Sequence, residues 1–456
     1  MNRAFPPDFS WGVATTAVQI EGGIEGSGRG RSMWPAFAAR PGKIRHGDTP
    51  EGAAASFEFL ERDLDALANL NVSAYNFSAS WPRLLPEGAG RVDERGVGYY
   101  DRLIDGLLER GIEPDLSLYD WDLPLGYAED GGWERRELSE RFGDYVDLLI
   151  RSYGDRVGRW MTFNEVSTQA TNGYKSGNHA PGRTSIQGCL RAYHHLMLAH
   201  GQSVRRIREA VDGATISVVD NLLQYYPATV TDADRLATDR QWRINSWYFL
   251  DALFKGTIDD EFRRHHEETL GASFDHVRDG DLETINCPFD EFGVNYFTSF
   301  SVADDPDDPG RDEVISPAPG PQSPFGWTLD PHGMLLALRT LRRDYTGDLP
   351  LFIGECGIGQ IDTPGPDGRV KDPERIDYLE SHLEKVLEAI DEGIPVKGFY
   401  VWSLMDNYEW DDGYEKRFGL HYTRYDDPAE YLIKDSGKWY AKVCEANALP
   451  DRDDRD

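Results

Sequence analysis

Eight short apolar runs alternate with long amphipathic runs along this chain, and that alternation restricts the fold more than any other feature. The expected strands are residues 9–15, 72–81, 113–121, 159–165, 214–221, 289–296, 349–355 and 396–403. Apolar residues at helical spacing predict helices at 56–70, 98–110, 138–153, 186–210, 236–254, 331–345, 373–391 and 436–446. Strands that alternate with helices form a parallel sheet, and eight such units close into a barrel. We therefore predict an α/β fold, a single (β/α)8 TIM barrel.

The length of the chain, 456 residues, suits one large barrel with insertions. Because no Pro/Ser-rich linker divides the sequence, we expect one domain over residues 1–456, ending in an acidic tail at about 450–456. An Asp/Pro/Gly-rich stretch, 303–322, is too short for a domain of its own. It is predicted to be a loop that forms a lid or rim of the active site.

The formal net charge is -32, with 38 Arg against 10 Lys, and the acidic residues are spread over the whole sequence. Such a surface keeps a protein soluble but repels itself, which high salt makes tolerable. The composition therefore favours a halophilic protein of a salty cytoplasm over an ordinary acidic enzyme. This charge argues against nucleic acid and anionic membranes as partners, because both need basic patches. The sequence shows no apolar leader and no run of about 18 apolar residues.

Two of the expected strands end on a glutamate. The strand 159–165 stops at Asn164 and Glu165, and the strand 349–355 stops at Glu355. A lone strand-end Glu is more often a capping or surface carboxylate. A pair at the ends of two strands is the minimum equipment of a glycosidase, and the C-terminal ends of barrel strands are where active sites lie.

Other polar and aromatic residues stand at, within or just after the expected strands, and they predict a polar and aromatic ring around the mouth of the barrel: Gln19, Asn76, Asp120, Asn295, Tyr296 and Trp402. The four cysteines are scattered without CxxC spacing, and the strand ends carry no His/Cys cluster and no Ser/His/Asp set. The sequence thus predicts no metal and no cofactor.

Several motifs, in this order, resemble glycoside hydrolase family 1, the β-glucosidase and β-galactosidase family. The resemblance spans nearly the whole chain, and its most specific part is the run from Gly398 to Trp410 followed by Arg417–Leu420. The other motifs are at residues 9–15, 19–22, 77–83, 121–124, 162–165 and 293–296. The resemblance implies a retaining β-glycosidase acting on a small soluble β-glycoside or oligosaccharide.

The resemblance also implies a role for each matching residue. Glu165 would be the acid/base and Glu355 the nucleophile, with Tyr296 hydrogen-bonded to Glu355. Asn164 would hold the sugar 2-hydroxyl. The remaining substrate-binding positions would be Gln19, Asp120, Asn295, Trp402, Glu409, Trp410 and Phe418. In such a mechanism the charge of Glu355 keeps Glu165 protonated until a glycosyl ester forms.

The sequence departs from the family pattern beside the expected nucleophile. Asn76 stands where the family usually has Arg, Asp120 where it usually has His, and Val166 where it usually has Pro; Glu355 is flanked by Gly354 and Cys356. Three interpretations therefore stay open: an ordinary β-glycosidase, a relative with altered sugar specificity or glycosyl transfer, and a catalytically silent sugar-binding protein. The sugar, the aglycone and the oligomeric state are not predicted.

Overall fold

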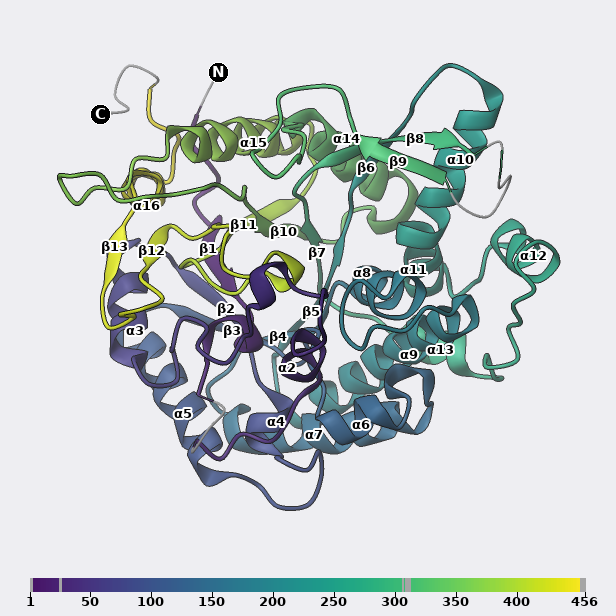
Figure 1. Cartoon of the computed structure of the whole chain (residues 1–456), viewed down its shortest axis with the longest axis horizontal. Helices are drawn as coiled ribbons and strands as arrows, with labels where there is room; N and C mark the ends of the chain where they lie inside the picture. The colour runs from purple at the N-terminus through teal and green to yellow at the C-terminus, as the bar shows by residue number, and fades with distance from the viewer. Residues whose placement is uncertain (1–2, 24–26, 306, 308–312, 452–456) are drawn as a thin grey trace.

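The computed structural model describes residues 3–23, 27–305, 307 and 313–451. Eight parallel strands form a closed barrel at the centre of the molecule, in the order β1-β11-β10-β7-β5-β4-β3-β2 (Figure 1). They are β1 (Ser10–Thr15), β2 (Ala74–Ser78), β3 (Glu113–Ser117), β4 (Arg159–Asn164), β5 (Thr215–Asn221), β7 (Glu291–Asn295), β10 (Leu351–Cys356) and β11 (Val396–Trp402). Each expected strand is found, and the predicted TIM barrel is confirmed.

Helices surround the barrel and connect its strands (Figure 1). The longest are α3 (Leu60–Asn69), α5 (Glu94–Glu109), α7 (Glu137–Tyr153), α9 (Ile186–Ala210), α10 (Asp232–Trp242), α14 (Pro331–Leu341), α15 (Pro373–Asp391) and α16 (Asp435–Ala446). The predicted bounds of α9 and α15 are met at both ends. Shorter helices are α1 (Ala17–Ile20), α2 (Met33–Ala38), α4 (Trp81–Leu84), α6 (Leu125–Glu129), α8 (Val166–Ala170), α11 (Tyr248–Leu250), α12 (Asp260–Glu268) and α13 (Asp281–Ile285).

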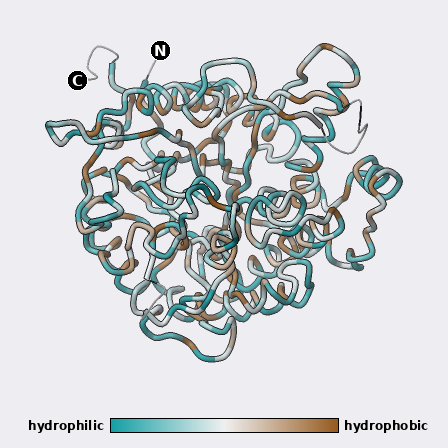
Figure 2. Tube along the Cα trace, in the orientation of Figure 1, coloured by the Kyte–Doolittle hydropathy of each residue, from teal (hydrophilic) through white to brown (hydrophobic). Residues whose placement is uncertain are grey.

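Apolar residues pack in two places, inside the barrel and between the barrel and its helices. One interior layer consists of Ala74, Met161, Val219, Phe352 and Tyr400. The outer core is much larger, and Figure 2 shows hydrophobic and hydrophilic residues alternating along the surrounding helices. This alternation follows from the helical spacing of apolar residues in the sequence, which turns one face of each helix to the strands.

The stretch 303–322 was predicted to be a loop, and this prediction was wrong in part. A second sheet stands beside the barrel, in the order β6 (Gln224–Pro227), β8 (Ser299–Asp304), β9 (Glu313–Pro317). Strands β8 and β9 pair antiparallel, so the stretch begins at the end of one strand and contains the other. The Asp/Pro/Gly content marks the hairpin connection, whose residues 306 and 308–312 lie outside the described ranges.

The two ends of the described chain lie side by side, because the Phe5 amide donates to the Asn447 carbonyl oxygen at 2.9 Å. A small antiparallel pair, β12 (His421–Thr423) and β13 (Tyr431–Ile433), precedes the last helix. Most of the expected acidic tail, residues 452–456, lies outside the described residues. Within the described ranges, no helix combines the length and the apolar character that crossing a membrane requires.

Candidate active site

The carboxyl ends of the barrel strands meet at one mouth, and two irregularities in strand pairing aim side chains into it. Met161 and Phe352 face the barrel interior, so strict alternation would turn Asn164 and Glu355 outward. The pairing of β4 with β5 shifts register between Met161 and Asn164, and that of β10 with β7 shifts between Ile353 and Glu355. An extra residue of this kind re-aims the side chains that follow it. Both strand ends therefore present polar groups to the mouth.

Three residues at the same place have strained backbone conformations. Glu165 has a φ of 51°, Trp121 of 60° and Trp410 of 48°, all in the left-handed region that non-glycine residues rarely adopt. All three residues line one pocket. Strained backbone persists where the surrounding structure fixes a side chain for a task, so this clustering supports a functional site.

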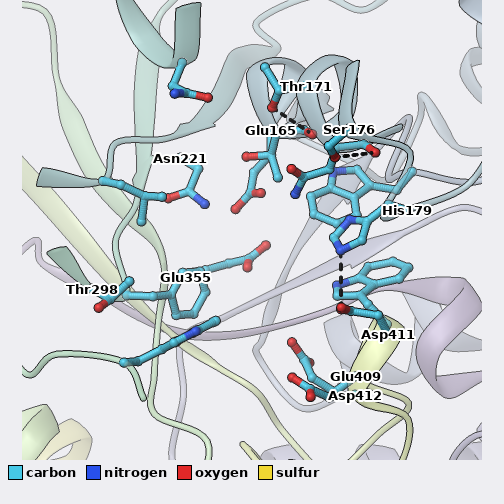
Figure 3. Close-up of a pocket in the computed structure, with 18 of the residues that line it drawn as sticks. Glu165, Thr171, Ser176, His179, Asn221, Thr298, Glu355, Glu409, Asp411 and Asp412 are labelled. Carbon is cyan, nitrogen blue, oxygen red and sulfur yellow. Dashed lines mark hydrogen bonds and ion pairs between the residues drawn. The ribbon is translucent and has the colours of Figure 1, made fainter. Parts of the chain in front are cut away.

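Two side-chain amides connect Glu165 to Glu355. The Asn295 amide nitrogen donates to Glu165 Oε1 at 2.8 Å and to Asn164 Oδ1 at 3.0 Å. The Asn164 amide nitrogen in turn donates to Glu355 Oε1 at 2.9 Å. Figure 3 shows the two carboxyl groups pointing into the same space from opposite sides. The amides hold two carboxyl groups facing each other across a gap that a substrate can enter.

Asp120 lies directly behind this pair. Its Oδ1 accepts from the same Asn164 amide nitrogen at 3.3 Å, and its Oδ2 accepts from Thr16 Oγ1 at 2.6 Å. Asp120 and Glu355 thus share one donor group. The side chain of Asn76 is engaged elsewhere, because its amide nitrogen donates to the Asp115 carbonyl oxygen at 3.1 Å.

Burial raises the pKa of four carboxyl groups at and behind the buried end of the mouth, those of Glu355, Glu165, Asp120 and Glu409. The pKa of Glu355 is well above its usual range, because burial and then the charges of Glu165 and Asp120 disfavour its ionised form. Burial also raises the pKa of Glu165, although the Asn295 hydrogen bond opposes it. Burial raises the pKa of Asp120 to about 7 and that of Glu409 to about 8. Buried carboxyl groups this close share protons near neutral pH.

The mouth of the barrel contains a pocket of about 770 Å³. Its buried end holds Gln19, whose amide nitrogen donates to the Tyr408 carbonyl oxygen at 2.7 Å and contacts Glu409 Oε2 at 3.5 Å. A buried aromatic wall contains Phe297, Trp402 and Phe418, with Trp327 packed against it. Hydroxyl-binding polar groups beside flat apolar rings suit a sugar, which has both kinds of surface.

Comparisons with known proteins decide the family. The family model described as Glycosyl hydrolase family 1 matches residues 1–449. Beta-glucosidase A of Thermotoga maritima is 38% identical over 98% of this chain and 99% of its own length. The 1,4-beta-D-glucan glucohydrolase of Thermotoga neapolitana is 37% identical over 98% and 100%. The solved beta-glucosidase of T. maritima in complex with castanospermine has a TM-score of 0.92 at 37% identity and covers 98% of this chain and 100% of its own.

The chain belongs to glycosyl hydrolase family 1. It is a retaining O-glycosyl hydrolase that cleaves small β-glycosides through two carboxyl groups, the reaction general to the family. The resemblance seen in the sequence is therefore confirmed at the level of family and reaction, and the interpretation as a silent sugar-binding protein is set aside.

Most of the side chains expected at the site of this family 1 enzyme line the pocket: Gln19, Asn164, Glu165, Glu355, Trp402, Glu409, Trp410 and Phe418. Asp120 and Asn295 stand one layer behind and act on the lining residues through hydrogen bonds. The sequence could not separate these two layers, because both contain residues at strand ends, such as Asn164 and Asn295.

The expected hydrogen bond from Tyr296 to Glu355 was wrong. The Tyr296 hydroxyl donates to the Asp330 carbonyl oxygen at 2.9 Å, and its ring is part of the outer core. Asn295 faces into the barrel, so the alternation along the strand turns Tyr296 outward and brings Phe297 to the pocket. The residue that faces the pocket here has no hydroxyl to offer a carboxylate.

Sequence reasoning missed several lining residues, among them Asn221, His179, Asp411, Asp412 and Lys416. Asn221 ends β5, so the rule that found Asn164 could have found it. His179 pairs with Asp411 at 3.5 Å, and Lys416 Nζ lies 3.3 Å from Asp412 (Figure 3 labels the first two and Asp412). His179 and Lys416 lie in loops, and Asp411 and Asp412 lie in a single 3-10 turn (Trp410–Asp412). No local pattern predicts the direction of a side chain in such segments.

Proposed function

We propose that Glu165 is the acid/base and Glu355 the nucleophile of this family 1 enzyme. One observation carries the proposal: the two carboxyl groups are held facing each other across the pocket by the chain Glu165–Asn295–Asn164–Glu355. Both carboxyl groups are almost fully buried, and they come from different strands. Neither forms an ion pair within the described residues, so a purely structural role does not explain their burial.

The chemistry follows from charge. Ionised Glu355 attacks the anomeric carbon, while protonated Glu165 gives its proton to the leaving oxygen. The glycosyl ester that forms removes the negative charge of Glu355. The pKa of Glu165 then falls, so Glu165 can take a proton from the water that hydrolyses the ester. Asn295 favours this second step because its hydrogen bond stabilises the ionised form of Glu165.

The shape of the pocket supports removal of one terminal sugar at a time. Gln19, Glu165, Glu355, Trp402 and Glu409 form a buried end. Asn172, Lys175, Asn245 and Phe300 are half-buried, and Ile315 is 46% exposed, so the opposite end is open. The terminal sugar would occupy the buried end, and the aglycone would extend past Lys175. Relatives named beta-glucosidase and glucan glucohydrolase support a gluco-configured β-glycoside or short oligosaccharide.

We also propose that this enzyme works in a salty cytoplasm and that the whole chain is one catalytic domain. The proposal rests on the net charge of -32 and the low Lys content. The same charge argues against nucleic acid as a partner.

The test of the catalytic roles is mechanism-based labelling. A 2-fluoro β-glycoside of an accepted sugar should form a stable ester on Glu355, and peptide mass spectrometry should find it there. The Glu355→Gln variant should stay unlabelled, whereas Glu58→Gln, a change at an exposed residue, should label like the unmodified enzyme. A label on another carboxyl group, or a product of inverted configuration by NMR, refutes the assignment.

A further inference from the structure

The buried end of the pocket is strongly acidic. Glu165, Glu355 and Glu409 line it, and Asp120 lies immediately behind. Within the described residues, two lysines line the same pocket. Lys416 is paired with Asp412 at 3.3 Å and stands 3.5 Å above the Trp327 ring, and Lys175 belongs to the half-buried outer part. Neither lysine forms an ion pair with Asp120 or Glu355, so within the part of the chain that the structure describes no cation balances these two carboxyl groups.

The donors around these carboxyl groups are already engaged. The Asn164 amide nitrogen serves both Glu355 and Asp120, and the Asn295 amide nitrogen serves Glu165 and Asn164. Among the described side chains at this end, the buried polar atoms that lack a partner are acceptors: Gln19 Oε1, Asn221 Oδ1 and Asn295 Oδ1. A ligand at this end of the pocket therefore gains most from hydrogen-bond donors.

Asp120 makes the requirement electrostatic. Its side chain is buried, and burial together with the charge of Glu165 raises its pKa to about 7, so an ionised Asp120 is costly while the site is empty. A sugar hydroxyl would supply one donor and no charge. An ammonium group would supply three donors and a positive charge.

We propose that the terminal sugar of the substrate carries a free amine at the carbon next to the anomeric carbon, and that the negative charge of Asp120, one layer behind the pocket lining, favours this ammonium group. The position follows from Asn164: its amide joins Asp120 to Glu355, and Glu355 attacks the anomeric carbon, so the neighbouring carbon is the one nearest Asp120. The inference rests on the proposed catalytic roles. The substrate class is thus a β-glycoside of a 2-amino sugar, and Asp120 determines that specificity.

Asp120 would also serve the reaction itself. An ammonium group beside the anomeric carbon opposes the positive charge that develops there in the transition state. A carboxylate close to that ammonium group offsets part of its charge and so reduces the opposition. Asp120 should therefore affect kcat as well as KM for the amino sugar, whereas a residue that only supports the fold would change all substrates alike.

The experiment compares three nitrophenyl β-glycosides: the free 2-amino glucoside, the glucoside and the N-acetyl derivative. The unmodified enzyme should prefer the free amine over the glucoside by about tenfold or more in kcat/KM, the discrimination expected of a hydrogen bond to a charged group. Asp120→Asn should remove that preference, since the isosteric amide can keep the Thr16 contact and loses only the negative charge. Asp155→Asn makes the same change in net charge at a side chain that is 75% exposed and should alter neither rate.

Each result has one meaning. The comparison of substrates on the unmodified enzyme does not depend on the folding of a variant. Activity on the free 2-amino glucoside that only equals or falls below activity on the glucoside overturns the inference. So does an Asp120→Asn variant that slows the amine and the glucoside equally. If the glucoside is cleaved with the label on Glu355 in either case, the proposed catalytic roles stand. If no glycoside labels Glu355, those roles fail instead. Glucosamine should also inhibit glucoside cleavage more strongly than glucose, and the reverse order contradicts the inference.

Discussion

Replacing Lys434 with Met should destabilise the protein by about 3–5 kcal/mol, the cost of leaving a buried charge uncompensated. Lys434 Nζ lies 2.5 Å from Asp362 and 2.6 Å from Asp406, and all three side chains are buried. Asp362 also pairs with Arg375, and Asp406 with Arg417. Together with Asp372, which pairs with Arg375, three carboxylates face three cations. Removing one cation leaves one net negative charge inside the protein.

The network also supports the pocket, because Asp406 Oδ1 accepts from the Gly419 amide at 2.9 Å, next to the wall residue Phe418. The assay is urea unfolding followed by tryptophan fluorescence in molar KCl, with Lys438→Met as the control. Lys438 is 45% exposed and paired with Asp435, so its loss should cost less than about 1 kcal/mol. Salt screens buried charges little, so the difference should persist at higher KCl. Equal destabilisation by the two variants would refute the reasoning.

Three further predictions follow from charge and burial. Because the net charge is -32, the urea midpoint should rise from dilute buffer to molar KCl, and a flat or falling midpoint contradicts the salt-adapted interpretation. Glu409, with a pKa raised to about 8, binds a proton more tightly in the folded state; its contribution to stability is therefore lost as pH rises from about 5 to about 8. Glu409→Gln should gain stability relative to the unmodified protein over that range, and a constant difference in unfolding midpoint argues against the shifted pKa. Glu165→Ala should slow cleavage of alkyl β-glycosides by about 10²–10⁴-fold and affect ester formation from nitrophenyl glycosides much less, measured by the initial burst; equal losses would remove Glu165 from the acid role.

The sequence by itself determined the architecture. The spacing of apolar residues locates all eight strands and the helices between them. Burial repeats every 2 residues in a strand and every 3.6 residues in a helix, and both repeats are local properties of the chain. Glu165 and Glu355 could be singled out for the same reason: each directly ends an apolar run, and parallel strands bring such ends together. The family motifs added roles to these positions.

The tertiary structure decided which way the side chains at those ends point. Asn164 and Glu355 enter the mouth because pairing with β5 and β7 inserts an extra residue, and no signal within either strand encodes that shift. Strand β7 has regular alternation, so Tyr296 turns to the outer core and Phe297 to the pocket. The sharing of one Asn164 amide by Asp120 and Glu355 likewise joins residues 44 and 191 positions apart. Register and hydrogen bonding between distant segments are properties of the packed barrel, and the chain specifies them only when all eight strands are closed.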